Sequence, residues 1–178
     1  MISEKTSMDL EKLCNEVKQI ARTAGEYLKN EQALLRRNDI ELKGTRNYVT
    51  YIDKEAEQML VAALQKTFPE AGFLTEENTV TFEQRAFTWI IDPLDGTTNY
   101  VHGDTPFSVS IALMKEGEVI LGVVFDPVAD QMFYATEKGK AFLNDLPLQV
   151  SRQSSLENGY IGFGIPYSLD EKGEQILQ

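Results

Sequence analysis

The chain has 178 residues, of which 42% are hydrophobic and 25% are charged, and its formal net charge is −11. That size and composition fit one soluble globular domain, or one and a half by length, with a sizeable core. The negative charge disfavours nucleic acid and anionic membranes as partners, because both repel an acidic surface. An anionic ligand would need a bound divalent cation to reverse the local field.

Three further features of the sequence indicate the cellular compartment of the protein. No apolar run approaches the length of a membrane span, and the longest clear one, residues 119–125, is typical of a buried strand. The N-terminal stretch is too polar for a secretory signal. The one cysteine, Cys14, excludes an intramolecular disulfide and favours a reducing compartment. We therefore expect a cytoplasmic protein.

Two helices are predicted in the first part of the chain. Over residues 9–32 apolar side chains recur at helical spacing, and Asp9 suits the N-cap. Residues 31–49 are expected to form a loop or an irregular hairpin around Gly44. The second helix is predicted over residues 52–67, and a proline and a glycine shortly afterwards end it.

Strand patterns follow the helices, and the last of them marks a possible new sheet. The expected strands are residues 73–75, 87–91, 107–114, 119–125, 131–136 and 160–163. Helices followed by consecutive hairpins predict an α+β fold, with two N-terminal helices packed on a mainly antiparallel sheet. We expect residues 1–150 to form this unit with the functional site, and residues 151–178 to begin a second, truncated α/β subdomain.

The segment WIIDPLDGTTNY, residues 89–100, joins a strand to two aspartates. Residues three apart on a continuous strand point to opposite faces, so Asp92 and Asp95 could not share a ligand there. Pro93 is expected to make Asp92 the last residue of the strand, and Gly96 permits a tight bend. The turn would bring both carboxylates to one side, ahead of a short helix that begins near Thr97.

Two carboxylates beside backbone amides that favour an anion point to a cation between them. Mg²⁺ prefers oxygen ligands, often one or two carboxylates with water and a substrate phosphate. The Leu94 carbonyl and the Thr97 hydroxyl could add neutral oxygens, whereas one cysteine and one histidine do not suit zinc. Turn and helix-cap chemistry explains two aspartates at this spacing about as well, but the whole string favours a site.

Other polar residues could contribute to the site. Glu76 follows a short predicted strand and so lies at a strand end, as Asp92 does, although a solvated acidic loop is the favoured explanation when this stretch is taken alone. Asp53 belongs to a capping box that opens the second helix, and capping is compatible with a catalytic role. Lys43 lies in the preceding loop and could equally be an exposed turn residue.

On these residues the chain resembles the inositol monophosphatase family, within the wider group of Mg²⁺-dependent, lithium-sensitive phosphatases. The uninterrupted string over residues 89–102 fits the first signature of that family. The weaker matches are Lys43, residues 49–53, Glu76-Glu77, residues 107–113 and residues 164–167. The resemblance implies the layered α/β sandwich of the sugar phosphatases, here with its second sheet layer incomplete.

The resemblance also implies roles. Glu76, Asp92 and the Leu94 carbonyl would hold one metal, Asp92 and Asp95 would share a second, and the amides of Gly96 and Thr97 would bind phosphate beside Asp95. Thr97, helped by Asp53 and Glu76, would activate a water that attacks phosphorus, with Lys43 as a possible loop contributor. The implied cofactor is Mg²⁺, as two or three ions. Mn²⁺ would be a substitute and Ca²⁺ and Li⁺ inhibitors. The implied partners are a small phosphorylated substrate and a second copy in a homodimer.

The sequence departs from the family after residue 167. The second signature, built on Trp-Asp, would supply the last ligand of the second metal, and Trp89 is the one tryptophan here. We expect a Mg²⁺-dependent phosphomonoesterase that acts on inositol monophosphate or a similar polyol or sugar phosphate. Activity like that of a 3′(2′),5′-bisphosphate nucleotidase or a fructose-1,6-bisphosphatase stays open. So does an inactive fragment that binds metal and phosphate without turnover.

Overall fold

The computed structural model describes residues 9–34, 40–43, 47–160 and 162, with side chains for 9–34, 51–160 and 162. By its internal contacts the chain divides into two units, Met1–Leu148 and Gln149–Gln178. The first unit carries the helices and the sheets. In the second, the described residues include a single 3₁₀ turn, Leu156–Asn158, in which the Glu157 amide donates to the Ser155 hydroxyl.

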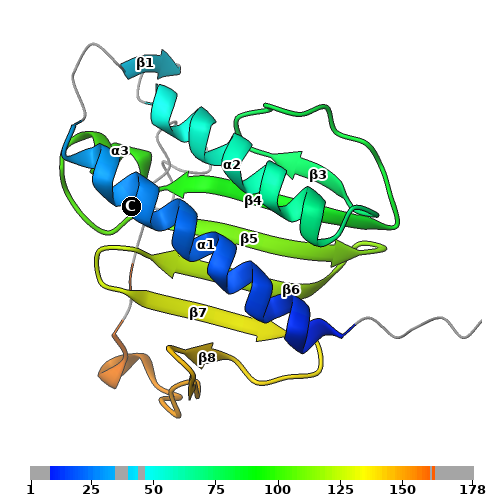
Figure 1. Cartoon of the computed structure of the whole chain (residues 1–178). Coiled ribbons are helices and arrows are strands. Elements are labelled where there is room, and N and C mark those ends of the chain that lie inside the picture. Colours follow the sequence, from blue (N-terminus) through cyan, green and yellow to red (C-terminus); the bar gives the residue numbers. More distant parts are fainter. Residues whose placement is uncertain (1–8, 35–39, 44–46, 161, 163–178) are drawn as a thin grey trace, which may run out of the picture. The chain divides into compact units, whose positions relative to one another are not determined.

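Two helices form one layer of the first unit, as predicted. Helix α1 spans Leu10–Gln32, and the Asp9 side chain caps it by accepting a hydrogen bond from the Lys12 amide at 3.0 Å. Helix α2 spans Tyr51–Thr67 and begins one residue earlier than predicted. Figure 1 shows both helices crossing the same face of the sheet.

Small residues let α1 approach the sheet closely. Its buried side recurs every three or four residues and includes Ala21, Ala24 and Gly25. A Cβ atom added at Gly25 would lie 2.6 Å from the ring of Phe125, a buried residue of the sheet. The glycine therefore sets how near the helix packs to the strands.

The main sheet has seven strands in the order β3-β4-β5-β6-β7-β8-β9. All neighbours are antiparallel except β3 and β4, which are parallel, so the predicted mainly antiparallel sheet is confirmed. The strands are β3 (Gly72–Thr75), β4 (Phe87–Asp95), β5 (Ser108–Lys115), β6 (Glu118–Asp126), β7 (Gln131–Thr136), β8 (Phe142–Leu143) and β9 (Leu146–Pro147).

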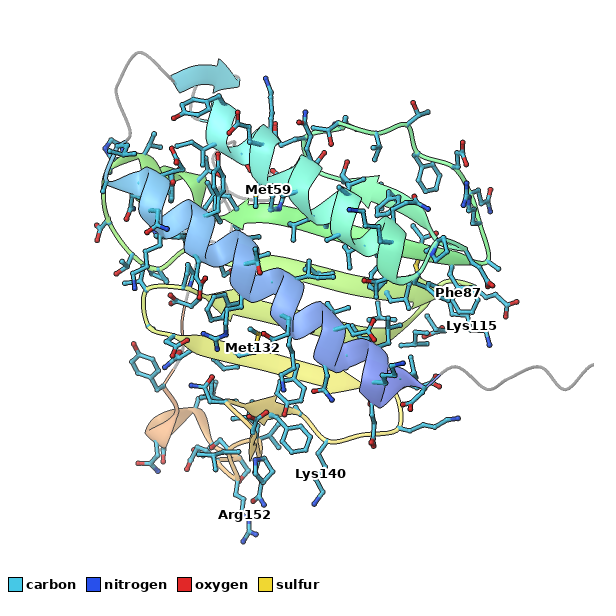
Figure 2. All side chains as sticks on the ribbon, in the orientation of Figure 1. Met59, Phe87, Lys115, Met132, Lys140 and Arg152 are labelled. Atoms are coloured by element: carbon cyan, nitrogen blue, oxygen red, sulfur yellow. The ribbon has the colours of Figure 1, made fainter. Side chains whose placement is uncertain are left out.

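Local turn chemistry sets the register of the central hairpin. Between β5 and β6, Glu116 and Gly117 both adopt positive φ, the conformation that a tight hairpin turn requires. At this end of the sheet Phe87 pairs with Lys115, whose ammonium lies 5.8 Å from the centre of the phenyl ring. Figure 2 shows the two side chains together at the strand ends.

A smaller hairpin precedes α2. Strands β1 (Ile40–Lys43) and β2 (Asn47–Thr50) pair antiparallel in regular register, so of the two alternatives the hairpin is confirmed rather than the loop. The predicted strand at 160–163 falls largely outside the described residues. Within the described part of the chain, no helix combines the length and apolarity needed to cross a bilayer.

Candidate metal and phosphate site

A β-bulge in β4 shapes the candidate site. The prediction that the strand ends at Asp92 is wrong, because β4 continues to Asp95. Asp92 pairs with Ser110 and Asp95 pairs with Ser108, so three steps along β4 match two steps along β5. The missing N–H of Pro93 is tolerated within this irregularity, where regular pairing is interrupted.

The extra residue brings the two aspartates to one face. Ser108 and Ser110 lie two apart on β5 and therefore face the same side of the sheet, and so do the residues that pair with them. Pro93 and Leu94 are buried in succession, which interrupts the alternation of β4. The two carboxylates, three residues apart in sequence, therefore lie on one face because of a bulge and not because the strand ends at Asp92.

A third carboxylate joins them from the neighbouring strand. Glu76 follows β3 directly, and its amide donates to the Ile91 carbonyl at 3.2 Å, which extends the parallel pairing by one residue. This pairing places Glu76 beside Asp92, where its negative charge acts on the Asp92 carboxyl. Burial, the charge and hydrogen bond of Glu76, and the charge of Asp95 together raise the pKa of Asp92 to about 7.

The turn after β4 opens helix α3, Thr97–Val101, close to the predicted short helix. Gly96 caps this helix at φ 91°, in the left-handed region. A Cβ atom there would lie 2.9 Å from the Pro106 carbonyl oxygen, so the turn has no room for a side chain. The Thr97 hydroxyl donates to the Leu94 carbonyl at 2.9 Å, which joins two predicted site groups directly.

Asp53 reaches this region from the helix layer. It lies in the first turn of α2 and is 3% exposed, so its carboxylate is enclosed by protein. Burial raises the pKa of Tyr100, which lies in α3, and the negative charges of Glu31 and Asp53 raise it further. The structure therefore places Asp53 near the helix that Thr97 begins. The Lys43 side chain lies outside the described residues.

One residue that the sequence analysis missed is Glu57, which is completely buried in α2. Its carboxylate accepts hydrogen bonds from the Glu77 amide at 2.7 Å and from the amide and hydroxyl of Thr79 at 2.8 and 2.6 Å. The sequence feature that could have identified Glu57 is its position: it is a charged residue one turn after Asp53, on the helix face that also carries Leu60 and Leu64.

A pocket of about 460 Å³ opens beside the bulge, within the range of small-molecule sites. Its wall includes Asp95 and Gly96 from the site and Ser108, Asp126 and Gln131 from the neighbouring strands. These side chains offer carboxylate, hydroxyl and amide groups to a ligand that carries hydroxyls.

The donor set of the site fits a hard divalent cation. Carboxylates and a backbone carbonyl are oxygen ligands of the kind Mg²⁺ prefers. Among the described residues, no three Asp, Glu, His or Cys side chains stand as a complete ligand set. Burial and the charge of Glu76 raise the pKa of Asp92, and a cation bound there would favour its ionised form.

The fold and the site together define an α+β protein with a carboxylate cluster at a bulged strand end. The chain belongs to the inositol monophosphatase family, whose model matches residues 9–177. This assignment agrees with the resemblance seen in the sequence.

Curated relatives show how the family varies. The chain is 39% identical over 156 residues to an inositol-1-monophosphatase of Mesorhizobium japonicum, covering 87% of this chain and 59% of that protein. It is 40% identical over 150 residues to Nus factor SuhB of Pseudomonas aeruginosa, covering 83% and 55%. It is 45% identical over 114 residues to a fructose-1,6-bisphosphatase/inositol-1-monophosphatase of Thermotoga maritima, covering 64% and 44%.

Solved structures agree with the fold. The SuhB protein of Bartonella henselae matches with a TM-score of 0.74 and 38% identity, over 78% of this chain and 54% of that one. An inositol monophosphatase of Thermotoga maritima gives a TM-score of 0.73 at 38% identity, over 79% and 54%. The matched part of the chain thus spans a little over half the length of these two solved structures.

Proposed function

We propose that this chain carries the metal- and phosphate-binding part of a Mg²⁺-dependent phosphomonoesterase that acts on inositol monophosphate or a similar polyol or sugar phosphate. The observation that carries the proposal is the grouping of Glu76, Asp92 and Asp95 on one face of the sheet, where the bulge and the parallel strand pair bring them together. In this proposal residues 1–150 form the unit with the site, and 151–178 begin a second subdomain.

In this proposal the residues have separate metal-binding and phosphate-binding roles. Glu76, Asp92 and the Leu94 carbonyl would hold one Mg²⁺, and Asp92 and Asp95 would share a second. Bound Mg²⁺ supplies Lewis-acid stabilisation of phosphate and lowers the pKa of water. The tight turn at Gly96 would leave its amide and that of Thr97 for phosphate oxygens, because no side chain fits there.

Proton transfer would fall to the chain's own groups. Glu76 would accept the proton of the attacking water, and the Thr97 hydroxyl, fixed by the Leu94 carbonyl, would orient it with help from Asp53. Lys43 would contribute from the hairpin before α2. The pocket beside Asp95 is large enough for a small polyol, and its polar wall suits hydroxyl groups.

The experiment is a phosphate-release assay with inositol monophosphate, fructose 1,6-bisphosphate and 3′-phosphoadenosine 5′-phosphate, beside calorimetric titration of Mg²⁺ on the same sample. We expect release that requires Mg²⁺ or Mn²⁺, is suppressed by Li⁺ and Ca²⁺, and is nearly abolished in Asp92→Asn. Ample release in chelator would overturn the proposal.

The second candidate is a chain that binds metal and phosphate without turnover. Mg²⁺ binding in the titration with no release from any of the substrates would favour it. Size-exclusion chromatography with light scattering tests the homodimer that we expect of the active protein.

A further inference from the structure

We propose that Glu57 is a positioning residue that fixes Glu76 for cation binding by clamping the loop after β3. This inference rests on the proposed function, because it assigns Glu57 a part in the same site. Glu57 does not touch the reacting groups. It acts through the backbone of residues 77–79, twenty residues away along the chain.

The clamp uses both oxygens of one buried carboxylate. Oε2 accepts from the Glu77 amide at 2.7 Å, and Oε1 accepts from the amide of Thr79 at 2.8 Å and from its hydroxyl at 2.6 Å. Glu57 is 0% exposed, so a carboxylate in that place requires such donors to offset its lost hydration.

The clamp acts on the segment that immediately follows the candidate ligand. On its N-terminal side Glu76 is tied to β4 by the hydrogen bond from its amide to the Ile91 carbonyl. On its C-terminal side Asn78 adopts a left-handed φ of 55°, and its side-chain amide donates to the Glu76 carbonyl at 2.9 Å. With Glu57 holding Glu77 and Thr79, both sides of Glu76 are fixed, which limits where its carboxyl can lie.

Helix α2 thereby links two parts of the site. Asp53 and Glu57 lie one helical turn apart, and both are buried. Asp53 lies near α3, whereas Glu57 holds the loop that carries Glu76. Residues that orient metal ligands typically change metal affinity by about 10-fold to 100-fold when they are replaced.

The test compares Mg²⁺ affinity by calorimetry in the wild type, Glu57→Gln and Thr79→Val. In Glu57→Gln one carboxylate oxygen becomes an NH₂ group that faces an N–H donor, so we expect affinity to fall by about 10-fold. Thr79→Val loses only the hydroxyl bond and should show a smaller loss, and Thr79→Ser should restore wild-type affinity.

A matched control separates positioning from general destabilisation. Leu64 lies two turns further along α2 and is also 0% exposed, so Leu64→Val loosens the same helix face without altering the clamp. We expect it to lower the melting temperature and leave Mg²⁺ affinity unchanged. Equal affinity in Glu57→Gln and the wild type would overturn the inference, as would an equal loss in Leu64→Val.

Amide hydrogen exchange provides a readout that needs no cation. In the wild type the amides of Glu77 and Thr79 should be protected, and in Glu57→Gln they should exchange at least 10-fold faster, while amides in the middle of β5 keep their protection. Unchanged protection would overturn the inference. If the wild type bound no Mg²⁺, the proposed function would fail, and exchange would still decide whether Glu57 holds the loop.

Discussion

Glu76 lies beside Asp92 across the parallel strands β3 and β4, because its amide donates to the Ile91 carbonyl at 3.2 Å and continues the pairing of those strands. Burial and the negative charge of Glu76 disfavour the ionised form of Asp92 and raise its pKa to about 7. A proton on Asp92 and a bound cation would therefore compete for the same carboxyl oxygens near neutral pH.

In chelator, Asp92 should make the protein less stable as the pH rises. Its pKa is raised from 3.8 in the ordinary carboxyl to about 7 in the folded chain, by burial, by Glu76 and by Asp95. Between about pH 4 and pH 7 the folded state binds more protons than the unfolded state. The contribution of Asp92 to the free energy of unfolding is therefore complete below about pH 4 and is lost as the pH rises through 7. Thermal melts from pH 5 to pH 8 should show it.

The control for this slope is Asp92→Asn, which cannot ionise at this position. Its side-chain oxygen still accepts from the Leu94 amide, a bond that measures 3.1 Å in the wild type. We expect the difference in melting temperature between variant and wild type to grow from pH 5 to pH 8. Parallel melting curves across that range would contradict the assignment.

Mg²⁺ should stabilise the protein more at pH 8 than at pH 5, because at low pH protons compete for the same oxygens. At a concentration of 100 times its dissociation constant a ligand adds about 2.7 kcal/mol to folding stability. Differential scanning fluorimetry with and without Mg²⁺ measures the gain. Asp95→Asn should reduce it at both pH values, and an equal gain at both in the wild type would argue against competition between Mg²⁺ and a proton on Asp92.

Replacing Gly96 with alanine should destabilise the turn and weaken phosphate binding. A side chain at φ 91° costs about 1–2 kcal/mol, and here the added Cβ also meets the Pro106 carbonyl oxygen at 2.9 Å. Gly117→Ala is the matched control, because Gly117 has φ 94° but nothing within 4 Å of the added Cβ. Chemical denaturation should give the larger loss for Gly96→Ala, and equal losses would contradict the steric account.

Gly25→Ala should lower stability although alanine favours helices. The propensity gain is about 1 kcal/mol, whereas overpacking a dense core typically costs about 1–3 kcal/mol. The added methyl would meet the Phe125 ring at 2.6 Å and the Pro127 side chain at 3.1 Å. Urea unfolding checks the sign, and Phe125→Leu in the same chain should recover part of the loss.

The elements of this fold follow from local sequence more directly than its site does. The Asp9 cap and the apolar spacing were enough to predict α1, since both act within a few residues. The bulge was not predictable in this way. It depends on how β4 registers against Ser108 and Ser110, and that pairing is a long-range property.

Glu57 is a second case in which local sequence does not predict a contact, here one made by a helix. The helical spacing placed α2 to within one residue, but the donors that make a buried carboxylate tolerable lie in a loop twenty residues later. Asp92 and Asp95 were accessible to sequence reasoning because their chemistry is concentrated in one continuous string. Contacts between distant segments came only from the structure.

The bulge in β4 also makes the site sensitive to the length of the chain. Between Asp92 and Asp95 the strand carries one residue more than β5 opposite it. Inserting one residue between Ser108 and Ser110 of β5 would restore regular alternation opposite Asp92 and Asp95, and it would turn the second aspartate toward the layer that α1 and α2 occupy. The same strand would still form and its composition would hardly change, but the two carboxylates would be separated by the thickness of the sheet. In this segment the residue count determines function as much as residue identity does.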